Sequence, residues 1–289
     1  MEIMVRQATI ADEKSVVGLI EEASRAYLCF KLEDLKKCLG ARLFLLAYAR
    51  EQLLGFMFWD LRCLPLARLQ GAGLADGWPV SDYLQTLLPP SLELLRPQDA
   101  TALIYVGSEE WLTASLQDHG FVVDNVIVAY TKNDWAVPAR GNQEVSVRSA
   151  QPRDLPALVA LDQAAFDPLW QNTPDTFRDV LVSYPHFVVA ELDGVVVGYE
   201  FSSVTEGRGY LARVTVHPGY QGRGIGVRLM AEAIAFFKRE GARVIILNTQ
   251  QDNLASQRLY RRFGFRLVGE EALVLRRENQ RCRHRDVTR

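Results

Sequence analysis

Short apolar runs separated by polar turns alternate with amphipathic stretches along the chain, and the second half shows this pattern most clearly. Apolar runs over 186–192 and 195–205 flank Asp193-Gly194, which is typical of a β-hairpin. Residues 224–240 place apolar side chains at helical spacing. The pattern also predicts strands at 145–149, 209–216 and 243–249, helices after Asp154, from Pro174 with Thr173 as N-cap and over 253–262, and a final strand pair after Gly264. Such alternation predicts a mixed α/β fold.

The same pattern occurs twice. Val5-Arg6-Gln7-Ala8 recurs as Val147-Arg148-Ser149-Ala150, and Gly120-Phe121 recurs as Gly264-Phe265, so the shift grows only from 142 to 144 residues. We therefore expect two tandem copies of one α/β fold. The predicted organisation is a first domain over 1–134, a linker over 135–144, a second domain over 145–278 and a basic tail over 279–289.

Composition narrows the class of protein without indicating an activity. The chain has 289 residues, enough for two domains, and 48% hydrophobic with 24% charged residues indicates packed cores. The net charge of −2 gives no electrostatic reason to expect nucleic acid or a membrane as partner. The four cysteines match no zinc spacing, so no metal is expected. A cytoplasmic protein is expected, because charges interrupt the first residues and no run reaches the roughly 20 apolar residues of a membrane span.

The residues with the clearest chemistry form the turn Gln221-Gly222-Arg223-Gly224-Ile225-Gly226, between a strand ending at Val216 and an amphipathic helix. Three glycines within five residues let the backbone turn tightly and approach a ligand. Amide N–H groups at a helix start lack a partner within the helix, so they suit a phosphate or pyrophosphate. The turn is neither a Walker loop nor a spaced dinucleotide fingerprint, and by itself it is also compatible with a plain tight turn.

Two motifs in this half resemble those of the GNAT superfamily of acyl-CoA N-acyltransferases. Gln221, Gly224 and Gly226 match the cofactor loop Gln/Arg-x-x-Gly-x-Gly/Ala. Residues 253–265 resemble the second motif, with Asn253 and Tyr260 at matching positions before the final Gly-Phe. The motifs stand in the family's order, and the resemblance covers roughly residues 145–278. It implies two tandem GNAT-like domains, each a mixed, mostly antiparallel twisted sheet flanked by helices.

The resemblance also implies a coenzyme A site, with acetyl-CoA as the acetyl donor. In the family, the strand before the loop separates from its neighbour at a bulge, and its backbone pairs with the pantetheine arm of the cofactor. The loop amides hold the pyrophosphate. The implied cofactor-binding residues are Val214, Thr215, Val216, Gln221, Gly222, Arg223, Gly224, Ile225, Gly226, Val227, Asn253, Ser256 and Tyr260.

Amide formation requires an amine to attack the thioester carbonyl, whose oxygen a strand N–H near Val216 would stabilise. Tyr260 fits the role of proton donor to the leaving thiolate, although a tyrosine here could equally pack against the sheet. Glu200 is the first candidate for the base, with Glu191 and His217 as alternatives. A strand glutamate is usually only solvated, and a water relay would need no side chain.

Asp167 and Trp170 are the candidates for binding a cationic amine, because they lie in a proline-containing loop between two predicted helices. A helix end and a core anchor are equally open interpretations of them. In the first copy, the Gly-rich stretch 71–79 lacks the loop pattern, and Leu116 stands where the second copy has Tyr260. We therefore expect a degenerate first copy without cofactor.

Taken together, the sequence predicts an acetyl-CoA-dependent N-acetyltransferase that acts on a primary amine of a small molecule or peptide, by direct attack in a ternary complex. Two alternatives are a non-catalytic acyl-CoA-binding regulatory protein and a tandem acetyltransferase similar to mycothiol synthase. The intact Tyr260 and Asn253 favour an enzyme. The sequence indicates neither the acceptor nor whether the protein forms a homodimer.

Overall fold

The computed structural model of the chain describes residues 2–279, which form two compact units. Unit 1 comprises residues 2–125 and 272–279, and unit 2 comprises residues 126–271. None of the helices in this part of the chain is both long and apolar enough to cross a membrane. The predicted basic tail lies outside the described residues, apart from Asn279. The side-chain amide of Asn279 donates to the Ala100 carbonyl at 2.9 Å.

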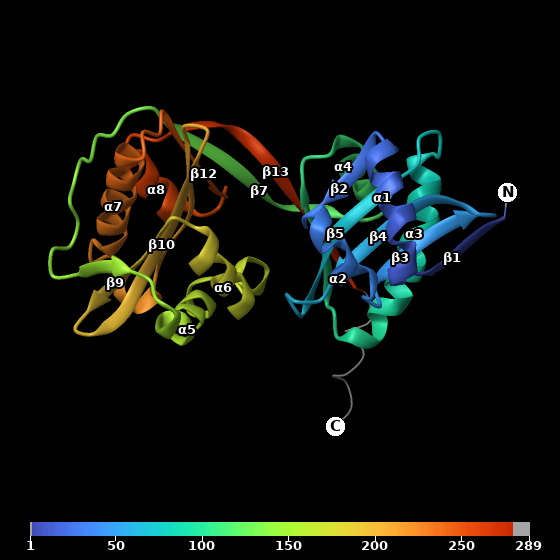
Figure 1. The fold of residues 1–289 in the computed structure, drawn as a ribbon, viewed down its shortest axis with the longest axis horizontal. Coiled ribbons are helices and arrows are strands. Elements are labelled where there is room, and N and C mark those ends of the chain that lie inside the picture. The colour runs from blue at the N-terminus through green and yellow to red at the C-terminus, as the bar shows by residue number, and fades with distance from the viewer. Residues whose placement is uncertain (1, 280–289) are drawn as a thin grey trace, which may run out of the picture. The chain divides into compact units, whose positions relative to one another are not determined.

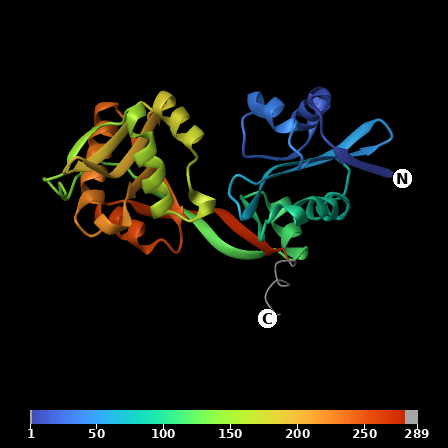
Figure 2. The same cartoon turned by 90° about the horizontal axis from the view of Figure 1, so that it is seen from below.

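Unit 1 is a sheet with helices on both faces, α1 and α2 on one side and α3 and α4 on the other (Figure 2). Its strand order is β1-β3-β4-β5-β6-β13, with β2 paired to β5, and only the β5–β6 pair is parallel. The elements are β1 (Ile3–Gln7), α1 (Glu13–Glu22), β2 (Arg25–Leu28), α2 (Leu35–Leu39), β3 (Phe44–Ala49), β4 (Gln52–Asp60), β5 (Leu66–Leu74), α3 (Val80–Leu95), β6 (Ala102–Gly107), α4 (Glu110–Asp118), the start of β7 (Val122–Lys132) and the end of β13 (Arg266–Glu278).

Unit 2 has the same design, with strand order β7-β12-β11-β10-β9-β8 and a single parallel pair, β11–β12 (Figure 1). Helices α5 and α6 cover one face of the sheet, and α7 covers the other. Besides most of β7, the elements are β8 (Ser146–Ser149), α5 (Leu155–Ala165), α6 (Pro174–Ser183), β9 (His186–Leu192), β10 (Val195–Thr205), β11 (Arg208–Val216), α7 (Ile225–Arg239), β12 (Val244–Gln250), α8 (Leu254–Arg262) and the start of β13. The predicted tandem α/β fold with mostly antiparallel sheets is confirmed.

Local signals in the sequence account for the ends of several elements. The turn between β9 and β10 has Asp193 at φ 51° and Gly194 at φ 77°, the left-handed pair that a tight hairpin needs. The Thr173 hydroxyl accepts a hydrogen bond from Thr176 N at 3.1 Å, which confirms the predicted N-cap of α6. The repeat is also visible in side-chain pairing, because Arg6–Asp12 and Arg148–Asp154 form the same ion pair in the two units, at 2.5 and 2.8 Å.

The end of each copy differs from the expectation. The strand pair predicted after Gly264 is instead one long strand, β13, which the polar residues Glu270 and Glu271 do not end. Its residues 273–278 pair with β6 of unit 1, while residues 127–132 of β7 pair with β12 of unit 2. Each unit thus takes its final strand from the other half of the sequence, so the units do not follow the predicted 1–134 and 145–278. Because the two copies offer similar strands, the repeat could not show which sheet each final strand joins.

Candidate acyl-CoA site

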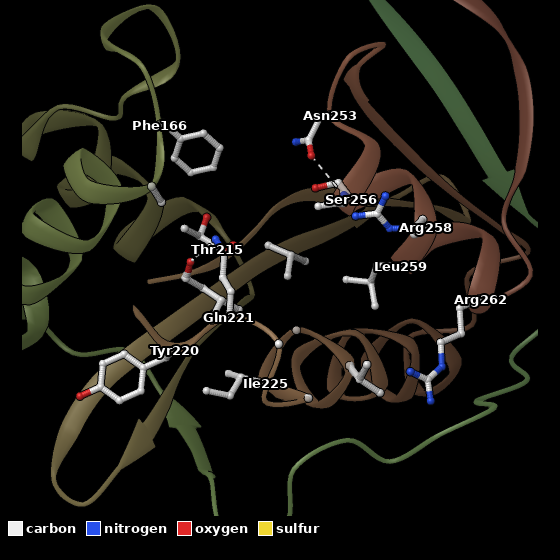
Figure 3. Close-up of a pocket in the computed structure, with 18 residues that line it drawn as sticks. Phe166, Thr215, Tyr220, Gln221, Ile225, Asn253, Ser256, Arg258, Leu259 and Arg262 are labelled. Atoms are coloured by element: carbon white, nitrogen blue, oxygen red, sulfur yellow. Dashed lines mark hydrogen bonds between the residues drawn. The ribbon is translucent and has the colours of Figure 1, made fainter. Parts of the chain in front are cut away.

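A pocket of about 780 Å³ lies in unit 2, between the end of β11, the start of α7 and the helix α8 (Figure 3). Side chains from α8, among them Ser256 and Leu259, lie across the pocket from Thr215 and Phe166 (Figure 3). Its lining includes Val214, Thr215, Val216, Gln221, Gly222, Gly224, Ile225, Gly226, Val227, Asn253 and Ser256. The structure therefore brings together eleven of the thirteen predicted cofactor residues, all except Arg223 and Tyr260.

Strand β11 presents an unpaired backbone edge to this pocket. The register between β10 and β11 shifts at Ala212, which is a β-bulge. The parallel pairing of β11 with β12 ends at Tyr210, so among the described residues 213–216 pair with β10 alone. This is the bulge and strand separation that the family resemblance implies, and it leaves main-chain groups that an extended ligand could pair with.

The loop before α7 has the backbone geometry of an anion site. Gly222 and Gly224 have φ of 76° and 77°, a left-handed conformation that side chains disfavour. Gly224 is the N-cap of α7 without a side-chain cap, so the first amides of the helix have no partner within it. Gln221 fastens the loop to the strand, because its side-chain amide donates to the Val216 carbonyl at 3.1 Å. Arg223 lies outside the pocket lining, with its guanidinium 5.2 Å from the centre of the Tyr220 ring.

Two residues of the predicted linker contact the backbone of this loop, which the sequence did not indicate. Asn142 donates from its backbone N to the Gly224 carbonyl at 3.2 Å and from its side chain to the Arg223 carbonyl at 3.1 Å. Gly141 approaches so closely that a Cβ there would lie 2.3 Å from Arg228 N. Residues 141–142 thus belong to the scaffold of the loop, although their composition is typical of a connection.

Helix α8 supplies the opposite wall. Asn253 is its N-cap and accepts from Ser256 N at 3.1 Å, so this motif residue both starts the helix and lines the pocket (Figure 3). Arg258 and Arg262 also line the pocket, and sequence reasoning missed them. Their spacing of four residues on one helical face was the available signal, because both then face the same side as Ala255 and Leu259.

Tyr260 lies on α8 with its side chain buried among aromatic rings. It is 7% exposed, and its ring centre lies 6.0 Å from that of Tyr130 and 6.1 Å from that of Phe265. Ser256, four residues earlier on the same helix, lines the pocket. Burial raises the pKa of Tyr260 to about 12, against the opposing effects of Ser256 and of Arg213. The hydroxyl therefore keeps its proton at neutral pH.

Glu200, the first candidate for the base, does not line the pocket. Strand alternation directs its neighbours Tyr199 and Phe201 toward α5 and α6 and leaves Glu200 fully buried on the other face. The Ser202 hydroxyl donates to one carboxylate oxygen, and His186 Nε2 lies 3.1 Å from the other without hydrogen-bond alignment. Burial raises the pKa of Glu200, and His186 and Ser202 oppose the shift. Alternation alone left open which face of the strand meets the pocket, and the structure turns Glu200 away from it.

The two alternatives to Glu200 have structural partners. Glu191 accepts from Arg148 Nε at 2.9 Å. His217 Nδ1 accepts from Gly219 N at 3.1 Å and so caps the short turn Pro218–Tyr220. Neither side chain is among the residues that line the pocket. The described pocket lining therefore provides no carboxylate or imidazole as a base, which favours the water relay.

Replacing Glu200 with glutamine is expected to change stability rather than turnover. Because the folded protein binds the Glu200 proton more tightly than the unfolded chain, folding stability falls as pH rises above about 4.5, the ordinary pKa of the carboxyl group, toward its raised value. Glu200→Gln removes this effect, so its Tm should fall less with rising pH than that of the unmodified protein. We expect kcat within about threefold of the unmodified enzyme, measured by thiol release. A roughly 100-fold loss of kcat with an unchanged Tm profile would instead identify a catalytic base.

The predicted acceptor residues lie beside the pocket rather than in it. Asp167 is exposed and Trp170 is half-buried in the short turn Pro168–Trp170, and neither lines the pocket, whereas the adjacent Phe166 does. Arg213 of β11 was not predicted from the sequence. Its guanidinium stacks over the Phe166 ring, 3.8 Å from the ring centre. Arg213 also forms an ion pair at 3.0 Å with the fully buried Asp162. An acid on the otherwise apolar face of α5 was the signal for this pair.

Comparison with known proteins agrees with these features. The Acetyltransferase (GNAT) family matches residues 155–265. An uncharacterised N-acetyltransferase of Methanocaldococcus jannaschii is 31% identical over 125 residues, which are 42% of this chain and 77% of that protein. The chain belongs to the GNAT acetyltransferase family. The N-alpha-acetyltransferase RimI of Mycobacterium tuberculosis is 40% identical over 97 residues, 32% of this chain and 59% of that protein.

The tandem arrangement also has a structural counterpart within the GNAT fold. A solved tandem GNAT protein from the clavulanic acid biosynthesis pathway superimposes with a TM-score of 0.62 over 96% of this chain and 99% of that one. At 14% identity this likeness concerns the fold. The protein is therefore an acetyltransferase with two GNAT-fold units, and the open strand edge and the glycine loop occur together in the second.

Proposed function

We propose that unit 2 transfers the acetyl group of acetyl-CoA to a primary amine of a small molecule or a peptide, by direct attack within a ternary complex. The observation that supports this most strongly is the unpaired edge of β11 leading directly to the glycine loop at the start of α7. An extended arm ending in a pyrophosphate fits both features at once, because the edge offers backbone pairing and the helix start offers free amides. Bound there, acetyl-CoA would supply an activated acetyl group.

Direct transfer is favoured by the side chains of the pocket. The described residues that line it include no cysteine, and Tyr260 keeps its proton at neutral pH. The backbone N–H groups near Val216 would stabilise the negative charge that develops on the carbonyl oxygen. Tyr260 would donate a proton to the departing sulfur. Water, rather than Glu200, would carry the proton away from the amine.

The acceptor enters from the side of Phe166 in this proposal, next to the segment that carries Asp167 and Trp170. The RimI relative, an N-alpha-acetyltransferase, supports a peptide amine as one class of acceptor. Small-molecule amines form the second class, since the pocket residues alone do not select between them.

The proposal is tested by mixing the full chain with acetyl-CoA and a panel of small amines and short peptides, and following free thiol release. We expect thiol release that depends on one class of amine, with acetylated product detected by mass spectrometry. Binding of acetyl-CoA by calorimetry without product on any amine would instead identify a non-catalytic acyl-CoA-binding protein. The same panel should contain an amino-sugar thiol precursor, because turnover confined to it would indicate a role similar to that of mycothiol synthase.

A further inference from the structure

The segment after the first helix of each copy has a different structure in the two units. In unit 1 it is the strand β2 (Arg25–Leu28). The repeat shift of 142 residues places Asp167 to Trp170 at the same position in unit 2, where the chain forms the short turn Pro168–Trp170 instead of a strand. The same position in the fold is therefore a strand in unit 1 and a short turn in unit 2.

The unpaired edge of β11 borders a groove in unit 2, and β5 has the geometry that would open the same groove in unit 1. The register of β5 shifts at Gln70, as that of β11 shifts at Ala212. Parallel pairing with the next strand ends at Arg68 in unit 1 and at Tyr210 in unit 2. Beyond these points β11 pairs with β10 alone among the described residues, whereas residues 71–74 of β5 pair with β4 on one side and with β2 on the other. Strand β2 thus occupies the backbone edge that remains open in unit 2.

Side chains complete the filling of the groove in unit 1. Tyr27 of β2 is buried, and its hydroxyl donates at 2.8 Å to the Val106 carbonyl on β6, across the separation of the strands. Gly71 and Gly73 correspond by register to Arg213 and Thr215. A Cβ at Gly71 would lie 3.0 Å from the Phe30 ring, and one at Gly73 would lie 2.5 Å from the ring of Phe56. Aromatic rings therefore fill the face that carries polar side chains in unit 2.

Unit 2 holds the corresponding segment away from the edge. Pro168 lacks the backbone N–H that a strand would donate. Arg213 donates to the Trp170 carbonyl at 2.5 Å while paired with Asp162. The Asp162 carboxylate also accepts from Asn172 N at 2.5 Å, and it accepts from the Tyr199 hydroxyl. A buried ion pair with this many partners fixes the C-terminal end of the segment, and the stacking of Arg213 on Phe166 holds its other end.

We propose that β2 takes, in unit 1, the place that the pantetheine arm of acyl-CoA takes in unit 2, so that the chain binds a single acyl-CoA. Arg213 and Asp162 act as positioning residues that keep the second groove open. The identity of the ligand rests on the proposed function, whereas the filling of the first groove does not. In this proposal the first copy lacks the groove for the pantetheine arm as well as the loop pattern for the pyrophosphate.

The test combines calorimetric stoichiometry with hydrogen exchange of the full chain, using acetyl-CoA as probe. We expect one acetyl-CoA per chain and new protection, on binding, of those amides in 213–216 that do not bond to β10. The amides that join β2 to β5 should be protected beforehand and unchanged by ligand. Two acetyl-CoA molecules per chain, or ligand-dependent protection at 71–74, would overturn the proposal. No binding at all would contradict the proposed function instead. Fast exchange, without ligand, of the amides that join β2 to β5 would still overturn the filling of the first groove.

Variants of Arg213 test the positioning role separately. In Arg213→Ala we expect faster exchange of residues 167–170 and about tenfold weaker acetyl-CoA binding, because a charge-assisted hydrogen bond is lost. Arg213→Lys keeps a donor and a positive charge and should recover most of the affinity. Weakened binding with unchanged exchange at 167–170, or no recovery in the lysine variant, would reject the role assigned to Arg213.

Discussion

Replacing Gly226 with leucine is expected to weaken acetyl-CoA binding by about 100-fold or more, while the protein stays folded. Gly226 lies in the first turn of α7, where a Cβ would point between Leu259 and Val216, both of which line the pocket. A leucine side chain would occupy the space in front of the helix amides that is proposed for the pyrophosphate. Overpacking of a tight site costs on the order of 1–3 kcal/mol. A 100-fold loss of affinity corresponds to about 2.8 kcal/mol, the upper part of this range. The measurement is calorimetric titration with acetyl-CoA.

Gly226→Ala is the matched control. Its Cβ would lie 3.4 Å from Leu259 Cδ2 and 3.7 Å from Val216 Cγ2, which are ordinary contacts. Alanine is also the better helix former by roughly 1 kcal/mol, so the Tm of this variant should be equal or higher. Gly224 offers no such control, because its φ of 77° strains any side chain. Full acetyl-CoA affinity in the leucine variant would refute the placement of the cofactor.

Replacing Tyr260 with phenylalanine should lower kcat by about 10² to 10⁴ without changing the affinity for acetyl-CoA. The aromatic ring would keep its contacts with Tyr130 and Phe265, so only the proposed proton donor is removed. Since burial raises the pKa of Tyr260 to about 12, the donor stays protonated as pH rises through neutrality. The rate of the unmodified enzyme should therefore show no loss from this group until the pH approaches that value.

Tyr130→Phe provides the comparison for this experiment. Tyr130 is equally aromatic, packs against Tyr260 and donates to the Gln257 side chain at 3.0 Å. Its hydroxyl also accepts from Arg261 at 3.5 Å, and Arg261 keeps its bond to Gln257 without it. The substitution should therefore lower the Tm by the loss of about 1–2 kcal/mol and leave kcat within about threefold. Equal effects of the two substitutions on kcat would mean that Tyr260 supports turnover through packing and not by donating a proton. An unaffected rate in Tyr260→Phe would place the proton donor elsewhere.

Most of the fold could be predicted because its signals are local. The Asp193-Gly194 turn, the N-cap Thr173 and the helical spacing of α7 each depend on a few neighbouring residues, and the bounds of β9 and β10 agree with those expected. The glycine loop was found in the same way, because an anion site requires glycines at neighbouring positions of the chain. Asn253 and the other cofactor residues came from the resemblance to the GNAT superfamily. Eleven predicted residues therefore meet in one pocket.

What the sequence could not provide depends on contacts between distant segments. Alternation showed that Glu200 lies on one face of β10, but only the packing of α7 decides that this face is closed. Arg213 is an ordinary strand residue until Asp162 and Phe166 come together around it. The strand partners of β7 and β13 were equally hidden, because two similar copies offer similar edges.

The exchange of final strands means that no cut at the predicted linker leaves both sheets complete. The first half encodes β7, which pairs with β12 in unit 2 and carries the Tyr130 ring that packs against Tyr260. Losing that half would remove an edge of the sheet and part of the wall behind Tyr260, whatever the first copy itself can bind. A cut within the linker would therefore take a strand from each sheet, whereas the segment 126–271 keeps β7 together with β12.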